Sequence, residues 1–235
     1  MPIPASGYAS CQECNGLTQR PAATSIFAAV SHRLAQLLSI VFHPLLVPTY
    51  LVLLLCYGWP SRLPVPGVAP VPATLLLQAW ALSFWLPSLL IGLMARFGLI
   101  SSVELPDRRQ RTAPLLLAAG GFAAAAVLLA SYAPQAELLS RLFAGITVSV
   151  LLTTLITLWW KISAHGVGMG GAVGLGLWLL TAPGRGSAAP LTLLAVLLLA
   201  AAVGWARLQL RAHTRAQVLA GLMLGTVIWL AFSAF

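Results

Sequence analysis

The chain is built mostly of long apolar runs, separated by short segments that are polar or rich in proline and glycine. A helix needs about 20 apolar residues to cross the hydrocarbon core of a bilayer. Seven runs approach that length, at residues 37–57, 73–95, 114–132, 138–160, 166–182, 190–206 and 216–234. Their leucine- and alanine-rich composition lacks the alternation of barrel strands, and lipid admits only helices or closed barrels. The pattern predicts an all-α polytopic membrane bundle with six to seven transmembrane helices.

The N-terminal part of the chain differs from the rest. Residues 1–25 are polar and predict a disordered tail, in which Cys11 and Cys14 form a lone C-x-x-C that is most simply interpreted as incidental. Between residues 26 and 38, apolar side chains recur at the spacing of one helical face, with polar residues between them. This stretch predicts an interfacial helix that leads into the membrane. The transmembrane domain is therefore expected to cover residues 26–235.

Composition supports a membrane protein and narrows the choice of partner. Hydrophobic residues make up 60% of the chain and charged residues only 7%, against roughly 25% charged residues in soluble domains. The 13 basic and 4 acidic residues give a net charge of +9. A nucleic-acid-binding protein would carry such charge on a soluble fold, which is not predicted here. The expected partners are the phospholipid bilayer and an anionic lipid, and not nucleic acid.

Three polar segments carry nearly all the reactive side chains, at residues 99–113, 161–165 and 205–217. Two predicted spans separate the first segment from the second, and two more separate the second from the third. All three should therefore emerge on one membrane face, together with the N-terminus. That face would hold ten of the 13 basic residues. The positive-inside rule would make it cytoplasmic, although arginines that bind phosphate do not report topology.

Glycine spacing predicts one close helix pair. Gly166, Gly170 and Gly174 recur every four residues in one predicted span, and Gly221 and Gly225 repeat that spacing in the last. Small residues at this spacing let two helix backbones approach closely in a membrane. The spans that follow the second and third polar segments are therefore expected to be neighbours, although glycine is common in membrane helices generally.

The polar face is suited to phosphate chemistry. His165 and His213 titrate near neutrality, and seven basic side chains lie in the same three segments, whereas the nearby carboxylates are only Glu104 and Asp107. So few carboxylates disfavour a metal site, and no cofactor is expected. On helical geometry His213 and Gln217 share one face, and the arginines from 207 to 215 form a second stripe. One imidazole can attack phosphorus and another can protonate the leaving oxygen, while guanidinium groups hold the phosphate.

These residues resemble the type 2 phosphatidic acid phosphatase superfamily. Arg207, His213 and position 217 have the spacing of its third signature, SRxxxxxHxxxD, and Lys161-Ile162-Ser163-Ala164-His165 is similar to its second, PSGH. The segment from Asp107 to Pro114 loosely resembles the first, KxxxxxxRP. The resemblance covers about residues 100–225. Its members hydrolyse lipid phosphates and pyrophosphates, including undecaprenyl pyrophosphate and phosphatidylglycerol phosphate, without a metal.

The resemblance implies a role for each matched residue. His213 would be the nucleophile that becomes phosphorylated, and His165 would be the acid for the leaving alcohol. Gln217 stands where the family has the aspartate that orients the nucleophile, Ala206 replaces the serine before the arginine, and Ala164 replaces a glycine. The phosphate would be bound by a further set of residues. These are Arg207, Arg108, Arg111, Lys161 and Ser163.

Three further residues are secondary candidates. Asp107 could replace the missing carboxylate, and Arg211 could contribute charge or could extend to headgroups instead, as could Arg215. His43 precedes Pro44, so this position is either a helix kink or the lining of a headgroup cavity opened by a broken helix. The two central histidines could also be interior residues of the bundle, and the arginines of 108–111 a positive-inside loop.

The sequence leaves two functions open. The first is a lipid phosphate or pyrophosphate phosphatase of the bacterial cytoplasmic membrane. The second is a relative that binds anionic lipid headgroups without turnover, as a carrier, a sensor or a subunit of a membrane complex, with Gln217 marking the loss of catalysis. A homo-oligomer is compatible with either function.

Overall fold

The computed structural model describes residues 22–60, 63, 73–103, 107–132, 137–182 and 187–234. Most of the expected polar tail lies outside these residues. Every regular element within them is helical. The α-helices are α1 (Ala22–Val41), α2 (Val47–Leu53), α3 (Ala73–Trp80), α4 (Leu86–Arg96), α5 (Thr112–Tyr132), α6 (Glu137–Thr157), α7 (Ala164–Thr181), α8 (Ala189–Gln209) and α9 (Arg215–Ser233). Two π-helical turns, η1 (Leu54–Gly58) and η3 (Ala81–Trp85), and a 3₁₀ turn, η4 (Arg108–Arg111), complete them.

Six helices in the described residues are long and apolar enough to cross a membrane. They begin and end within a few residues of the predicted spans, and α3, η3 and α4 together form one of them, Leu75–Arg96. Their outward faces carry exposed leucine side chains, such as Leu191 and Leu198 on α8, which lipid can cover. The predicted all-α polytopic bundle is confirmed, and the protein is an integral membrane protein.

The first predicted span, 37–57, is not one helix. The chain leaves helical geometry between the end of α1 and the start of α2, around His43 and Pro44. Proline has no backbone N–H to donate and clashes with the preceding turn, so it ends the helix there, and Pro48 occupies the first turn of the next. The short helix that follows, α2 with η1, is buried inside the bundle on one side through residues such as Leu51 and Leu55.

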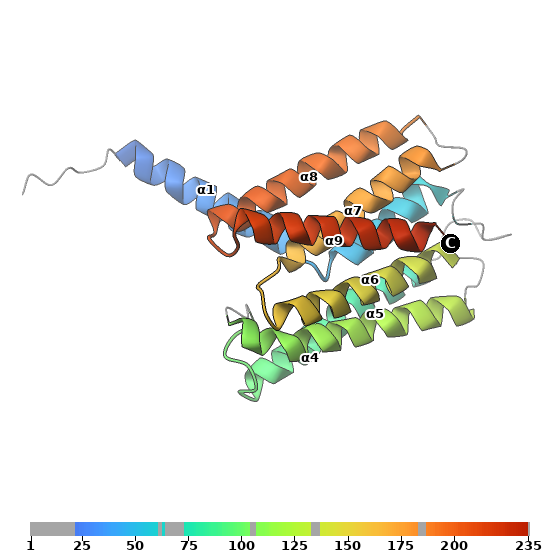
Figure 1. Cartoon of the computed structure of the whole chain (residues 1–235), viewed down its shortest axis with the longest axis horizontal. Helices are drawn as coiled ribbons and strands as arrows, with labels where there is room; N and C mark the ends of the chain where they lie inside the picture. The colour runs from blue at the N-terminus through green and yellow to red at the C-terminus, as the bar shows by residue number, and fades with distance from the viewer. Residues whose placement is uncertain are drawn as a thin grey trace, which may run out of the picture.

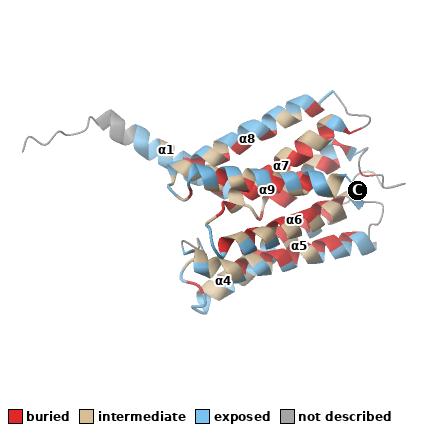
Figure 2. Cartoon of the chain, viewed as in Figure 1, coloured by how far each residue is buried: buried red, intermediate tan, exposed pale blue. Residues whose placement is uncertain are grey.

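The bundle has two packed groups of helices around this short segment. Helix α7 lies against α9 and α8, and α6 packs on α5 and also reaches α9, while α1 runs along the end of α8 (Figure 1). Buried residues gather on α6 and α7, whereas α1 and α8 are mostly exposed (Figure 2). The largest fully buried side chains include Phe122, Phe143 and Leu175. The core therefore lies between the two groups, where α2 is inserted.

The predicted glycine pairing of α7 with α9 is confirmed. A Cβ atom added at Gly170 would lie 2.1 Å from the carbonyl oxygen of Leu222, and one added at Gly225 would lie 2.0 Å from that of Val167. Thr226 donates a hydrogen bond across the same contact to the carbonyl of Gly170, at 3.0 Å. Only glycine permits backbones this close, so the pair fixes the relative position of the loops that begin the two helices.

Replacing Gly225 by alanine should therefore destabilise the protein strongly. The methyl group would overlap the Val167 carbonyl, and overpacking of this kind costs about 1–3 kcal/mol or more. Gly120 on α5 is the matched control, because an added Cβ there meets nothing within 4 Å. Thermal unfolding in detergent should show a lower transition temperature for Gly225→Ala and an equal or higher one for Gly120→Ala. Equal transitions for both variants would contradict the close packing.

The three polar segments emerge at one end of the bundle, as predicted. Figure 1 shows η4, the α6–α7 connection and the α8–α9 connection at the left end, opposite the C-terminus. Helix α1 also approaches the bundle at this end. The helices α5, α7 and α9 begin there, and helix N-termini favour anions because their backbone N–H groups and dipoles point toward them. The fold thus concentrates basic side chains and three helix N-termini at one end.

Candidate functional site

His213 is held by the residues that begin α9. Thr214 is the N-cap of this helix, and its hydroxyl accepts a hydrogen bond from the backbone N–H of Gln217 at 3.4 Å. The Gln217 side chain reaches back and accepts from the Thr214 backbone N–H at 3.1 Å, which completes a capping box. The same Gln217 oxygen lies 3.1 Å from Nδ1 of His213. Gln217 therefore both caps the helix and orients the histidine ring.

This arrangement determines which nitrogen of His213 carries the proton. The backbone N–H of Thr214 can only donate, so the Gln217 atom that it meets is the carbonyl oxygen Oε1. An oxygen can only accept from His213, so Nδ1 must be protonated. In the neutral ring Nε2 then has a free lone pair. His213 is therefore held as the tautomer that a nucleophile requires.

His213 is also kept neutral. It is 9% exposed, and this burial is the main reason that its pKa is lowered from 6.5 to about 4. The positive charges of Arg207, Arg111 and Lys161 lower the pKa further, whereas the hydrogen bond to Gln217 acts in the opposite direction. Burial disfavours the charged imidazolium, and nearby cations do the same. The lone pair on Nε2 is consequently available at neutral pH.

His165 lies in the first turn of α7 and is anchored by α1. Its Nε2 is 3.0 Å from the carbonyl oxygen of Ser39, a contact in which the ring must donate. The Ser39 carbonyl is available because α1 is ending: the N–H of Phe42 bonds to Leu38, and the N–H of His43 bonds to Ile40. Neutral His165 therefore has its lone pair on Nδ1.

His43 joins this cluster from the break between α1 and α2. Its ring stands edge-on to that of His165, with centroids 5.8 Å apart. The backbone N–H of Leu45 donates to Nδ1 of His43 at 3.3 Å, which places the His43 proton on Nε2. Of the two explanations for the His43-Pro44 pair, the broken helix that opens toward the polar site is the one that the structure supports.

Three cations face these histidines. Arg207 in the last turn of α8 lies close enough to act electrostatically on His165 and His213, and Arg111 and Lys161 act on His213 as well. Burial and the neighbouring guanidinium groups of Arg111 and Arg207 lower the pKa of Lys161. Among the described residues, no carboxylate forms an ion pair with Arg207 or Lys161. An anion placed here would relieve their mutual repulsion.

Two buried polar atoms beside the cluster have no hydrogen-bond partner within the part of the chain that the structure describes. They are Nε of Arg207 and the hydroxyl oxygen of Ser39. A buried donor without an acceptor costs about 1–3 kcal/mol, so such groups call for a partner such as a ligand. The unpaired guanidinium N–H of Arg207 is suited to a phosphate oxygen.

Two of the predicted phosphate-binding residues also make hydrogen bonds that hold the fold together. The Ser163 side chain is fully buried, and it caps α7 by accepting from the Gly166 N–H at 3.2 Å. The Ser163 N–H donates to the Gln217 carbonyl at 3.2 Å, which joins the two histidine loops. Arg108 donates to the carbonyls of Thr157 and Leu158 at the end of α6. Phosphate contacts from Ser163 and Arg108 stay predictions, and Arg111 is the arginine of the first segment that acts on His213.

Asp107 does not take the place of the missing carboxylate. It is exposed, and it caps η4 by accepting from the Arg109 N–H at 3.0 Å. Its charge acts on Arg111, whereas the position beside the His213 ring belongs to Gln217. The orienting group of the site is therefore a neutral amide.

The predicted arginine stripe is wrong, because α8 ends before it is complete. Arg211 has a φ angle of 50°, and the Ala212 N–H bonds back to the Arg207 carbonyl at 3.1 Å while the Arg211 N–H bonds to Leu208 at 2.9 Å. This is a Schellman motif, whose left-handed residue is usually glycine. Arg211 is exposed in this turn, and Arg215 is exposed after it.

Replacing Arg211 by glycine should stabilise the protein. A left-handed conformation costs a residue with a Cβ roughly 1 kcal/mol, and glycine does not have this cost. We expect a higher thermal transition in detergent for Arg211→Gly than for the wild type, with the site unchanged. Arg215→Gly is the control, because Arg215 is the first residue of α9, where glycine has no such benefit. A lower transition for Arg211→Gly would contradict this role.

Taken together, the site offers an imidazole nitrogen with a free lone pair, a second imidazole and three cations, which lie close enough to act on one another electrostatically. The arrangement can bind a phosphate group and present a nucleophile to it. Comparisons of this chain with protein-family models, with curated proteins and with solved structures find no match.

Proposed function

We propose that this protein is a metal-independent phosphatase of lipid phosphates or lipid pyrophosphates in the bacterial cytoplasmic membrane. The observation that carries the proposal is the His213 ring, whose Nδ1 proton is bound by Gln217 and whose Nε2 keeps its lone pair. It lies near Arg207 and Lys161, which form no ion pair with a carboxylate among the described residues. The position of the site at one end of a membrane bundle favours a substrate with an anionic head and an apolar tail.

The reaction proceeds in two displacements. Once the phosphate anion is bound, its charge favours the imidazolium form of His165, and Nδ1 takes up a proton from solvent. Nε2 of His213 then attacks phosphorus, the bond from phosphorus to the lipid oxygen breaks, and His165 gives its Nδ1 proton to that oxygen. Arg207, Arg111 and Lys161 hold the remaining phosphoryl oxygens and stabilise their charge. Water, activated by the now neutral His165, then attacks the phosphohistidine and releases inorganic phosphate. The Ser39 carbonyl stabilises protonated His165 by accepting from its Nε2 throughout.

Gln217 favours the second candidate function, in which the site binds a lipid phosphate without turnover. An amide orients His213 but cannot stabilise the imidazolium by charge as a carboxylate does. A protein of this kind would act as a carrier, a sensor or a subunit of a membrane complex.

Phosphate release from a panel of lipid phosphates in detergent separates the two functions. The phosphatase predicts release that is lost when the nucleophilic ring is removed. Saturable lipid phosphate binding with no release under any condition would support the binding protein. The absence of both would contradict the proposed site.

The pH dependence should report the lowered pKa of His213. Its neutral form attacks, so kcat/KM should fall only as pH drops through about 4, and not through 6.5 as for an ordinary histidine. A bound phosphate dianion stabilises the imidazolium and so raises the pKa of His213 in the complex. The acidic fall of kcat should therefore occur at a higher pH than that of kcat/KM. Initial rates across this range provide the measurement. A kcat/KM limb near 6.5 would show that His213 is solvated and not buried as described.

A further inference from the structure

An apolar cavity lies directly beside the polar site, inside the bundle. Its volume is about 80 Å³, and it is enclosed by α2, α5, α6, α7 and α9. Two of its lining residues, Pro44 and Ala164, are the sequence neighbours of His43 and His165. The cavity therefore begins where the histidine cluster ends.

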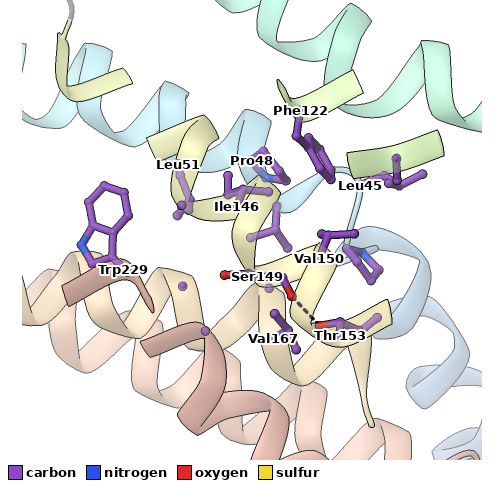
Figure 3. A pocket seen from close by; sticks show the side chains of 18 of the residues that line it. Leu45, Pro48, Leu51, Phe122, Ile146, Ser149, Val150, Thr153, Val167 and Trp229 are labelled. Atoms are coloured by element: carbon purple, nitrogen blue, oxygen red, sulfur yellow. Dashed lines mark hydrogen bonds between the residues drawn. The ribbon is translucent and has the colours of Figure 1, made fainter. Parts of the chain in front are cut away.

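The lining has the chemistry of a hydrocarbon environment. Figure 3 shows Leu51, Phe122, Ile146 and Val150 projecting into the space from three helices. No charged side chain lines the cavity among the described residues. Of the two hydroxyl side chains in the lining, that of Thr153 already donates its proton to the Ser149 carbonyl at 2.7 Å. The indole N–H of Trp229, also in the lining, has no hydrogen-bond partner among the described residues, and the other lining side chains are mainly apolar.

Glycine keeps part of the space open. An added Cβ at Gly171 of α7 would meet nothing within 4 Å, although Gly171 lines the cavity. Gly225 of α9, which packs directly against the backbone of Gly171, leaves no such room because the Val167 carbonyl occupies it. The glycines of α7 thus serve two purposes: one set admits α9, and Gly171 leaves space toward the cavity. A larger residue at position 171 could fill the cavity without moving the backbone.

We propose that this cavity binds the hydrocarbon chain of a lipid phosphate at the carbons nearest its head, while the phosphate occupies the histidine and arginine site. Three observations favour this occupant: the cavity adjoins the anion site, its lining is apolar, and the bundle is embedded in lipid. The part of this proposal that places a phosphate group at the polar site rests on the proposed function. Binding of the chain does not require turnover, so the two can be tested separately.

The experiment uses dodecylphosphonate with a diazirine at the fourth carbon. Its carbon–phosphorus bond resists hydrolysis, so labelling reports binding alone. The full-length protein in detergent is irradiated, and the labelled residues are identified by mass spectrometry. Dodecanol with the same diazirine is the probe without a phosphate-like head. We expect the phosphonate to label cavity residues such as Leu51, Ile146 and Val150, and the alcohol to leave them unlabelled.

Two variants sharpen the test. Gly171→Leu should fill the cavity and abolish labelling there, whereas Gly120→Leu adds the same side chain on the exposed side of α5 and should not. Labelling confined to outward leucines such as Leu194 and Leu198 would overturn the proposal, and so would equal labelling of the cavity by both probes. The wild-type map decides this even if Gly171→Leu fails to fold. Failure of phosphate release with cavity labelling intact would remove the phosphatase and retain this chain-binding site.

Discussion

Replacement of His213 by asparagine is expected to abolish phosphate release from lipid phosphates. The asparagine amide can still donate to Gln217 and preserve the start of α9, but it has no nitrogen in the place of Nε2. Loss of a nucleophile of this kind lowers kcat by about 10⁶-fold in a well-studied serine protease, and we expect the rate here to fall to the background of hydrolysis. Release of inorganic phosphate in detergent micelles measures the effect.

The controls separate a chemical role from a structural one. His32 is an exposed histidine on α1, so His32→Asn should retain full activity and the same thermal transition. His165→Asn should lose activity on an alkyl phosphate. On an aryl phosphate, whose weakly basic leaving group needs no acid, it should release about one phenol per site in a burst and then turn over slowly, because water lacks its base. Substantial turnover by His213→Asn on any phosphate would show that another group attacks phosphorus.

Replacement of Gln217 by glutamate is expected to raise kcat by roughly 2- to 30-fold. Glutamate has the length of glutamine and also serves as the third residue of a capping box, so α9 should begin as before. Its charge would stabilise the imidazolium that forms as His213 reacts. Hydrogen bonds to charged groups contribute about 1.5–3 kcal/mol, against about 1 kcal/mol for neutral ones. The gain is smaller than in proteases that lose an aspartate, because Gln217 already fixes the tautomer.

Gln217→Met is the variant to compare with Gln217→Glu, because it removes the hydrogen bond to His213 that glutamate should strengthen. Methionine has a similar shape but cannot accept from Nδ1, so the His213 ring is free to change tautomer. The N-cap bond of Thr214 remains, whereas the bond from the Thr214 N–H to the side chain at position 217 is lost, which costs about 1 kcal/mol. We expect kcat to fall while binding of a lipid phosphate is largely retained. An unchanged kcat in both variants would mean that the contact between Gln217 and His213 has no catalytic role.

Much of the fold could be predicted from the sequence because lipid imposes simple rules. Backbone groups must be satisfied within each segment, so apolar runs become helices, and six of the seven predicted spans are present. Alternation of span direction placed the three polar segments at one end. Glycine spacing predicted the contact of α7 with α9, because glycine at every fourth position leaves one helix face without side chains, against which another helix can pack closely.

The break in the first predicted span could not be predicted from the sequence in the same way. Its apolar residues continue through positions 43–48, and composition does not tell whether proline bends a membrane helix or ends it. In the structure the helix ends at Val41, and this leaves the Ser39 carbonyl free to accept a hydrogen bond from His165. A backbone carbonyl carries no sequence signal, so Ser39 could not have been predicted. The capping box of Thr214 and Gln217 was detectable as a T-x-x-Q pattern.

Several candidate residues make backbone contacts at helix ends that motif spacing could not predict. Motif spacing indicates which side chains lie near each other, but not which of them already form hydrogen bonds or turns at the ends of helices. Ser163 caps α7, Arg108 binds the carbonyls at the end of α6, and Arg211 occupies the turn after α8. Helix ends need such partners, and a site made of helix ends therefore uses some of its polar residues to satisfy them.

The most direct test of the account is to trap the phosphorylated intermediate. The wild-type protein is mixed with a lipid phosphate labelled at phosphorus, quenched in alkali within the first turnover, and digested for mass spectrometry. We expect an alkali-stable phosphoryl group on His213, absent from His213→Asn and accumulated in His165→Asn with an aryl phosphate. Steady phosphate release with no label on His213, or with the label on His165, would contradict the central claim.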